Sequence, residues 1–302
     1  MMRASNSLAH VSYFPGIDEV PLRQLVKMSF SIKKNLFEPS CFSVPSLFDI
    51  LTANAMAFHY IDHGLFDSDW SVYHRAVTFD HLRDVMVVRF IDLDTASHNY
   101  GLEGPGRIRT LHETDRFVEG IISAWRHKNP NLAVLCFADH GMVPVKSSIN
   151  VEASLSRTGL RAFRDFGMFL DSTMARFWGD EDTLGKIRRT LEKLDCGRIL
   201  EEKDLESYRL PRSSVWGDMI FLLKPGFVIS PNFFDRNGHV KAMHGYDPST
   251  PGLETIVIAN WPEHVAPRQL TNAAMIDVLP TALDILRLEG PPHLPGTSLL
   301  GS

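Results

Sequence analysis

The chain has 302 residues, 44% hydrophobic and 22% charged, an ordinary composition for a globular protein of one large domain or two small ones. Its net charge of −5 argues against a surface that coats nucleic acid, although a metal site could still bind a nucleotide or phosphate ester. Three widely spaced cysteines exclude a disulfide framework, and no stretch has the length of a membrane span or the apolar core of a signal peptide. We therefore expect a cytoplasmic protein.

Residues 1–43 carry few structural signals. Residues 16–21 suggest a turn and residues 22–28 a short helix, while the serines between residues 5 and 12 fit a frayed N-terminal segment. The pattern becomes clearer from Pro45. Residues 45–51 predict a helix with proline in its first turn, and residues 57–61 predict a strand.

The first cluster of candidate functional residues follows the apolar run at residues 85–91, which predicts a strand buried on both faces. Asp92, Asp94 and His98 come directly after it, where open α/β sheets place their ligands. One turn of helix or a tight loop could aim Asp94 and His98 at one point. Oxygen and nitrogen ligands at this spacing suit zinc or a similar divalent metal, but loops also carry solvated Asp and His.

A second cluster follows the next buried strand. Residues 107–127 predict a helix with an apolar face, residues 129–131 break it, and residues 132–138 predict another strand. That strand ends in Asp139 and His140. The order of strand, helix and strand indicates a parallel crossover connection.

A third cluster, His244-Gly245-Tyr246-Asp247, lies farther along the chain. Residues 182–194 predict a helix with Asp182 as its N-cap, and residues 219–223 and 255–259 predict strands. Residues 275–286 predict a helix in which Pro280 introduces a kink or a break.

The three clusters, in this order, resemble the motifs of the type I phosphodiesterase/nucleotide pyrophosphatase family of the alkaline phosphatase superfamily. That family carries D-x-x-G-H, S-D-H-G-M and H-G-Y-D; here they read Asp94 to His98, Ala138 to Met142 and His244 to Asp247. Ser97 replaces the family's glycine and Ala138 its usual serine, and neither position is a metal ligand. The helix and strand at residues 45–61 and the segments at 275–286 and 296–300 resemble the family too.

This resemblance, which covers Pro45 to the C-terminus, implies an α/β fold: a three-layer sandwich with a mainly parallel central sheet covered by helices on both faces. We expect residues 1–302 to form a single alkaline-phosphatase-like domain with an atypical N-terminal segment at 1–44. Residues 151–241, which lie between the second and third clusters, are expected to form a small lobe over the site, although no linker-like composition marks them as a separate domain.

The resemblance also implies two sets of metal ligands. Asp94, His98 and His244 would hold one ion. Asp139 and His140 would hold a second together with an Asp from the family's first strand, which we do not find here. We expect one or two divalent ions, zinc or alternatively manganese, with the second site weakened because catalytic zinc usually has three protein ligands. Each residue also has a structural alternative: the histidines as loop residues, Asp139 as an N-cap, and Asp247 as a residue that orients the His244 loop.

Two functions from different classes follow. The first is a metal-dependent hydrolase of phosphodiester, pyrophosphate or phosphomonoester bonds, in which the family uses a Thr or Ser nucleophile after its first strand. That strand and nucleophile are not found, so the chain is either a fragment of a longer protein or a departure from the family. The second function is therefore a non-catalytic or truncated member that binds metal or phosphate without turnover. We expect a small phosphate ester or nucleotide as ligand, neither nucleic acid nor membrane as partner, and the sequence gives no oligomeric state.

Overall fold

The computed structural model describes residues 42, 44–63, 67–211, 213–234, 239–261, 269–270 and 273–301. The turn and helix predicted at residues 16–28 and the serines between residues 5 and 12 lie outside them. The chain divides into two compact units. Within the described residues, the first comprises 97–102 and 142–253, and the second comprises 44–96, 103–141 and 254–301. We call the first the four-stranded unit, after its largest sheet. We call the second the ladder unit, because its described strands form only two-stranded ladders.

The ladder unit begins with helix α3 (Leu47–Ala53), which starts two residues after the start predicted at Pro45. Ser46 caps it: the Ser46 hydroxyl accepts from the Asp49 N–H, and the Asp49 carboxylate accepts in return from the Ser46 N–H. This reciprocal pair is a capping box, which satisfies N–H groups that a helix start leaves open. Strand β1 (Phe58–Ile61), helix α4 (Asp69–Thr78) and strand β2 (Val85–Val88) follow, and β1 pairs with β2 in parallel.

Helix α6 (Pro105–Lys128) confirms the helix predicted at residues 107–127 and begins with a proline in its first turn. It packs against α4 through aromatic contacts. The buried Trp125 donates its indole N–H to the Ala76 carbonyl, and the Tyr73 and Phe117 rings stack with centroids 4.9 Å apart. Strand β3 (Val134–Phe137) then pairs antiparallel with β12 (Val257–Asn260).

The last helix breaks where the sequence predicted. A 3-10 turn, η3 (Met275–Asp277), precedes α10 (Val278–Ile285), and Pro280 therefore lies in the first turn of α10, where its missing N–H costs little. Asp277 and Thr281 hold the C-terminal segment against this helix. The Asp277 carboxylate accepts from the Thr297 N–H at 2.8 Å, and the Thr281 hydroxyl accepts from the Leu299 N–H at 3.0 Å.

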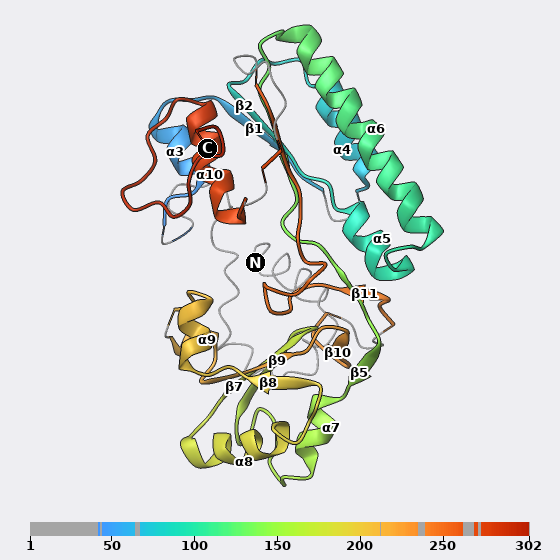
Figure 1. Ribbon diagram of the computed structural model, residues 1–302, viewed down its shortest axis with the longest axis vertical. Coiled ribbons are helices and arrows are strands. Elements are labelled where there is room, and N and C mark those ends of the chain that lie inside the picture. Colours follow the sequence, from blue (N-terminus) through green and yellow to red (C-terminus); the bar gives the residue numbers. More distant parts are fainter. Residues whose placement is uncertain are drawn as a thin grey trace, which may run out of the picture. The chain divides into compact units, whose positions relative to one another are not determined.

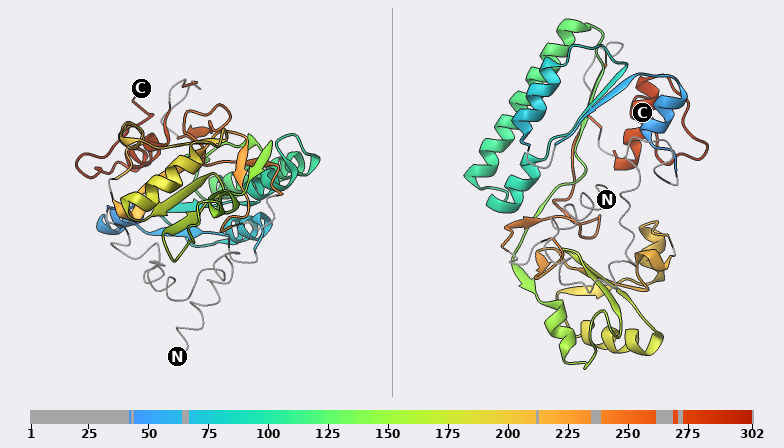
Figure 2. Two further views of the ribbon diagram at one scale, coloured as in Figure 1. Left: turned by 90° about the horizontal axis from the view of Figure 1, so that it is seen from below. Right: turned by 180° about the vertical axis from the view of Figure 1, so that it is seen from behind.

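Helices lie on both sides of the strands in the ladder unit. Figure 1 shows α4 and α6 on one side and α3 and α10 on the other, and the view from behind in Figure 2 agrees. The buried side chains of Ile61, Val72 and Ala76 form the core between β1 and α4. Helix α5 (Asp92–Tyr100) contributes residues 92–96 to this unit and residues 97–100 to the other.

The four-stranded unit is built on an antiparallel sheet in the order β6-β7-β9-β8. Its strands are β6 (Gly167–Leu170), β7 (Met174–Trp178), β9 (Met219–Leu223) and β8 (Gly197–Ile199). All five residues of β9 are buried. Its odd-numbered residues face the main core, which helices α7 (Val151–Ser156) and α8 (Glu181–Leu191) also line. Ile220 and Leu222 face a second cluster that includes Leu205 of helix α9 (Glu202–Ser207).

Two short ladders complete this unit. Strand β4 (Val143–Pro144) pairs antiparallel with β11 (Ala242–Met243), and β5 (Ser147–Ile149) pairs in parallel with β10 (Phe227–Ile229). A further 3-10 turn, η2, spans Ser214–Trp216.

The prediction of one mainly parallel central sheet requires correction. The strands among the described residues form five separate sheets, and only the β1–β2 and β5–β10 ladders are parallel. The predicted burial of β2 and β3 is also wrong: the residues of β2 are only half-buried, and β3 ends in an exposed Phe137. An apolar run does not fix the pairing partner that would complete its burial, and here β2 and β3 each hydrogen-bond to a single neighbour. The mixed α/β class is confirmed, whereas the single domain and the lobe at 151–241 stay predictions.

None of the helices in the described ranges is long and apolar enough to span a bilayer.

Candidate metal centre

Asp94 and His98 lie one turn apart on helix α5, which follows β2. The sequence left a helix or a tight loop open, and the structure shows a helix. The preceding loop is fixed by the buried carboxylate of Asp69, which accepts from the N–H groups of Ile91 and Asp92. Because residues four apart share one face of a helix, the side chains of Asp94 and His98 project from the same side of α5.

The ring of His98 is oriented by a backbone carbonyl. Its Nδ1 lies 2.8 Å from the carbonyl oxygen of Ala242 at the start of β11. Because a carbonyl only accepts hydrogen bonds, Nδ1 carries the proton and Nε2 bears the lone pair, the form in which imidazole binds a metal. The Lys241 N–H also donates to the His98 carbonyl at 2.7 Å, so the end of α5 and the start of β11 are joined twice.

His244 follows β11 directly, and its ring lies beside that of His98. The two ring centroids are 5.2 Å apart and the ring planes meet at 48°. A zinc ion bound about 2.0–2.1 Å from one nitrogen of each ring, with tetrahedral angles, would hold the centroids roughly 5 Å apart. The spacing of the two imidazoles therefore fits a shared divalent ion.

Asp139 and His140 lie next to each other after β3. The His140 Nδ1 lies 3.0 Å from the Gly141 carbonyl, which again leaves the lone pair on Nε2. That Nε2 is 3.6 Å from Oδ1 of Asp139, whose side chain is 82% exposed. Thr255 donates its hydroxyl to the Ala138 carbonyl at 3.0 Å and so holds the preceding residue in place.

The loop that carries His244 is held by three other segments of the four-stranded unit. The Thr173 hydroxyl donates to the Gly245 carbonyl at 2.7 Å, and the Tyr246 hydroxyl donates to the Phe227 carbonyl at 2.9 Å. Burial raises the pKa of Tyr246 to about 12. The Tyr208 hydroxyl donates to the carboxylate of Asp247, and this bond, followed by those from Ser249, lowers the pKa of Asp247 to about 2.

A second group with metal-ligating chemistry was missed in the sequence. His63, Asp69 and Asp92 converge in the ladder unit, with the His63 Nε2 3.3 Å from Asp92 Oδ1 and 3.9 Å from Asp69 Oδ1. Burial raises the pKa of Asp69. His63 was not predicted to have a site role, and Asp92 was predicted only as one of the polar residues that follow the strand at 85–91. His63 and Asp69 lie in none of the three motif clusters, so the motifs could not have found the group.

The five predicted ligands therefore have the following places. His98 and His244 meet in the four-stranded unit, Asp94 lies one helical turn before His98, and Asp139 and His140 are neighbours in the ladder unit.

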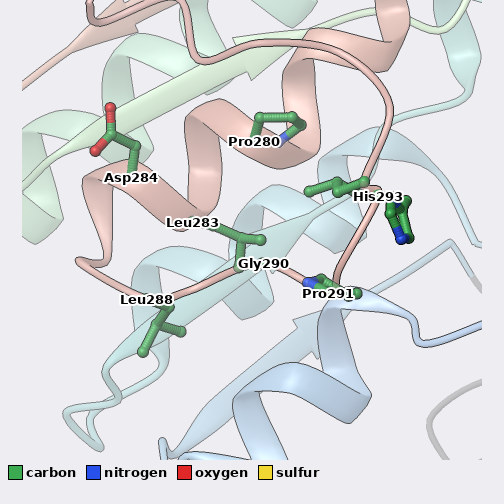
Figure 3. Close-up of a pocket in the computed structure, with 8 residues that line it drawn as sticks. Pro280, Leu283, Asp284, Leu288, Gly290, Pro291 and His293 are labelled. Atoms are coloured by element: carbon green, nitrogen blue, oxygen red, sulfur yellow. The ribbon is translucent and has the colours of Figure 1, made fainter.

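A pocket of about 380 Å³ beside α10 contains none of the five predicted ligands. Figure 3 shows that its walls come from α10 and the loop that follows, including Pro280, Asp284 and His293.

Comparison with solved structures supports the predicted fold independently of the sequence motifs. The fold resembles human ectonucleotide pyrophosphatase/phosphodiesterase 5, with a TM-score of 0.67 and 16% identity over 82% of this chain and 71% of that one. The murine protein of the same name gives a TM-score of 0.67 and 14% identity over the same shares. An inactive variant of the murine protein, in complex with AMP, gives 0.64 and 15%, again over 82% of this chain and 71% of that one. These identities are evidence for the alkaline-phosphatase-like fold alone, and a comparison with curated protein sequences gives no match.

The sequence profile of the type I phosphodiesterase/nucleotide pyrophosphatase family matches residues 53–247, more than half of the chain. The matched range contains all three motif clusters, from Asp94 to Asp247. It also contains the helix α5 and the loop after β11 that bring His98 and His244 together. The chain belongs to the type I phosphodiesterase/nucleotide pyrophosphatase family.

Proposed function

We propose that this protein is a metal-dependent hydrolase of phosphate esters, acting on phosphodiester, pyrophosphate or phosphomonoester bonds. The observation that carries the proposal is the pair of imidazoles from His98 and His244, whose 5.2 Å centroid spacing fits a shared ion. Membership of a metal-dependent family of phosphodiesterases supports the reaction class.

Asp94, His98 and His244 would hold one divalent ion, and Asp139 and His140 would contribute to a second. Zinc suits this set of carboxylate and imidazole ligands, and manganese is the alternative. A bound divalent ion would neutralise phosphate oxygens and so stabilise the charge of phosphoryl transfer. The chain's own contribution is orientation: the Ala242 and Gly141 carbonyls each fix Nδ1 of a histidine and present Nε2.

A small nucleotide is the proposed class of substrate. The solved structure of an inactive variant of the murine relative in complex with AMP supports this choice, although that complex concerns the relative and not this chain. The net charge of −5 does not oppose it, because bound cations supply the local positive charge in such sites. A cytoplasmic location stays a prediction, which fractionation of cells that express the protein would test.

The alternative is a protein that binds metal or phosphate without turnover. What favours it is that no serine or threonine nucleophile is assigned from the sequence. A metal-bound water would then have to attack directly, without the covalent step and its proximity advantage. We therefore expect this chain to hydrolyse p-nitrophenyl phosphodiesters slowly.

Metal content by mass spectrometry and turnover with added zinc or manganese, measured on one sample, test the proposal. His98→Ala should lower the metal content, whereas His112→Ala, which changes an exposed histidine on α6, should not. Unchanged metal content in His98→Ala would refute the site. Turnover on the order of 1–1000 per second would show that a nucleophile was overlooked. Activity that returns only with an upstream coding segment would identify the chain as part of a longer phosphodiesterase.

A further inference from the structure

Asp247 closes the His244 loop through a saturated set of hydrogen bonds. Its Oδ1 accepts from the N–H of Ser249 at 3.0 Å and from the Ser249 hydroxyl at 2.7 Å. Its Oδ2 accepts from the Tyr208 hydroxyl, with the Arg198 Nη2 at 3.5 Å. With both oxygens engaged by donors, Asp247 is better placed to anchor the loop than to bind a metal.

The two donors to Oδ2 are themselves held by other contacts within the four-stranded unit. Arg198 lies on β8 opposite Leu222 of the central strand, and its Nη1 is 2.7 Å from Oδ2 of Asp204 on α9. Its Nη2 also donates to the Tyr208 hydroxyl at 2.9 Å. Tyr208 ends α9 and packs on the cluster formed by Leu200, Ile220 and Leu222. The donors are therefore fixed before they reach Asp247.

We propose that Tyr208 and Arg198 are positioning residues that act through Asp247 to hold His244 in the orientation that binds the metal. Only two residues separate His244 from Asp247, and both are themselves fixed, Gly245 by Thr173 and Tyr246 by Phe227. A ligand held in place before the metal arrives loses less conformational freedom on binding. Outer groups of this kind typically change metal affinity by 10- to 100-fold. The inference rests on the proposed metal-binding role of His244.

Gly245 also helps to fix the conformation of the His244 loop. Its φ of +81° lies in the left-handed region, and a Cβ there would lie 2.9 Å from the Thr173 hydroxyl oxygen. The chain thus turns sharply between His244 and the anchor at Asp247. Any larger residue at position 245 would therefore be strained and would crowd the Thr173 hydroxyl that holds this loop.

The zinc dissociation constant, measured by competition with a chelating dye, tests the proposal. We expect Tyr208→Phe and Asp247→Asn each to weaken zinc binding about tenfold. Asp165→Asn is the matched control: Asp165 also has a pKa lowered to about 2, through Arg164, and lies in the same unit without contacting the loop. It should leave the zinc affinity unchanged. Thermal unfolding of the metal-free variants separates loss of fold from loss of affinity.

The double variant Tyr208→Phe/Asp247→Asn gives a readout that general destabilisation would not. If Tyr208 acts through Asp247, the double variant should bind zinc no more weakly than Asp247→Asn alone. Additive losses, or a Tyr208→Phe variant that keeps wild-type affinity, would overturn the proposal. Arg198→Lys gives a second route to the same test should Tyr208→Phe fold poorly, and it should also weaken zinc binding. If His244→Ala keeps full zinc affinity, the proposed function fails instead, and the two failures are thus distinguishable.

Discussion

Asp69 and Asp92 each cap the helix that the other one begins. The carboxylate of Asp69 accepts from the N–H groups of Ile91 and Asp92 at the start of α5, at 2.8 and 3.1 Å. The carboxylate of Asp92 accepts from the N–H of Asp69 at the start of α4, at 2.8 Å. Each acid also places a negative charge at the positive end of a helix dipole. The helix that carries Asp94 is therefore tied to α4 at its first residue.

Removing this cap should cost much more than removing a surface acid. We expect Asp69→Ala to lower the free energy of unfolding by about 2–3 kcal/mol, because two backbone N–H groups at the start of α5 lose a buried acceptor. The control is Asp80→Ala, since the Asp80 side chain is 82% exposed, and it should change stability by less than about 0.5 kcal/mol. Urea unfolding measures both, and equal effects would show that the reciprocal caps contribute nothing beyond surface charge.

One experiment should show which group of residues binds metal: the predicted ligands that include His98 and His244, or the group of His63, Asp69 and Asp92. We expect His63→Ala to leave the metal content unchanged while His98→Ala lowers it. The reason is that both Asp69 oxygens and one Asp92 oxygen already accept backbone N–H groups. Metal content by mass spectrometry distinguishes the two variants. A loss of one ion per chain in His63→Ala would instead make the second group a metal site.

Gly296 should be among the glycines least tolerant of substitution. Its φ is +87°, and a Cβ there would lie 2.2 Å from the Ile276 carbonyl oxygen. Gly159 has a similar φ of +76° but nothing within 4 Å of its Cβ position. We expect Gly159→Ala to cost about 1 kcal/mol from backbone strain and Gly296→Ala about 3 kcal/mol or more, because the backbone must also move. Similar midpoints in urea unfolding would contradict this.

Asp247 should make stability sensitive to acid. Its donors hold its pKa at about 2, below the ordinary value of 3.8. A carboxyl with a lowered pKa in the folded chain stabilises the fold above its unfolded pKa, and this contribution is lost as the pH falls from 3.8 towards about 2. We expect Asp247→Asn to be about 1 kcal/mol less stable near neutral pH, a modest value because the carboxylate is partly exposed. Thermal unfolding across this range should show the difference shrinking, and a constant difference would refute it.

Helices α6 and α8 followed closely from the sequence because their determinants are local, whereas α4, α7 and α9 were not predicted. The predicted helix at 107–127 became Pro105–Lys128, since Pro105 can occupy the first turn. The start of α8 was placed two residues late. Three acidic residues, 180–182, compete to cap it, and Asp180 wins because its carboxylate accepts from the Thr183 N–H at 2.8 Å.

Strand pairing and the surroundings of the site did not follow, because both depend on residues far apart in the chain. The apolar runs at 132–138 and 255–259 each predicted a strand, but neither run predicted that β3 and β12, 120 residues apart, would pair with each other in antiparallel fashion. Motif order pointed to His98 and His244, whose rings lie side by side. It could not point to Tyr208 or Thr173, which carry no motif and reach the His244 loop only in the folded structure.

The burial of every residue in β9 has a consequence for the unfolded protein. Met219–Leu223 is a run of five apolar residues with no polar position on either face of the strand. Unfolding of the sheet would therefore expose a continuous hydrophobic segment to solvent. Short segments of this kind promote aggregation, and charges at their ends slow it. Lys224 stands at one end and is exposed in the folded structure. Replacing it with alanine would leave the sheet intact, and the effect would appear as a lower yield on refolding from denaturant.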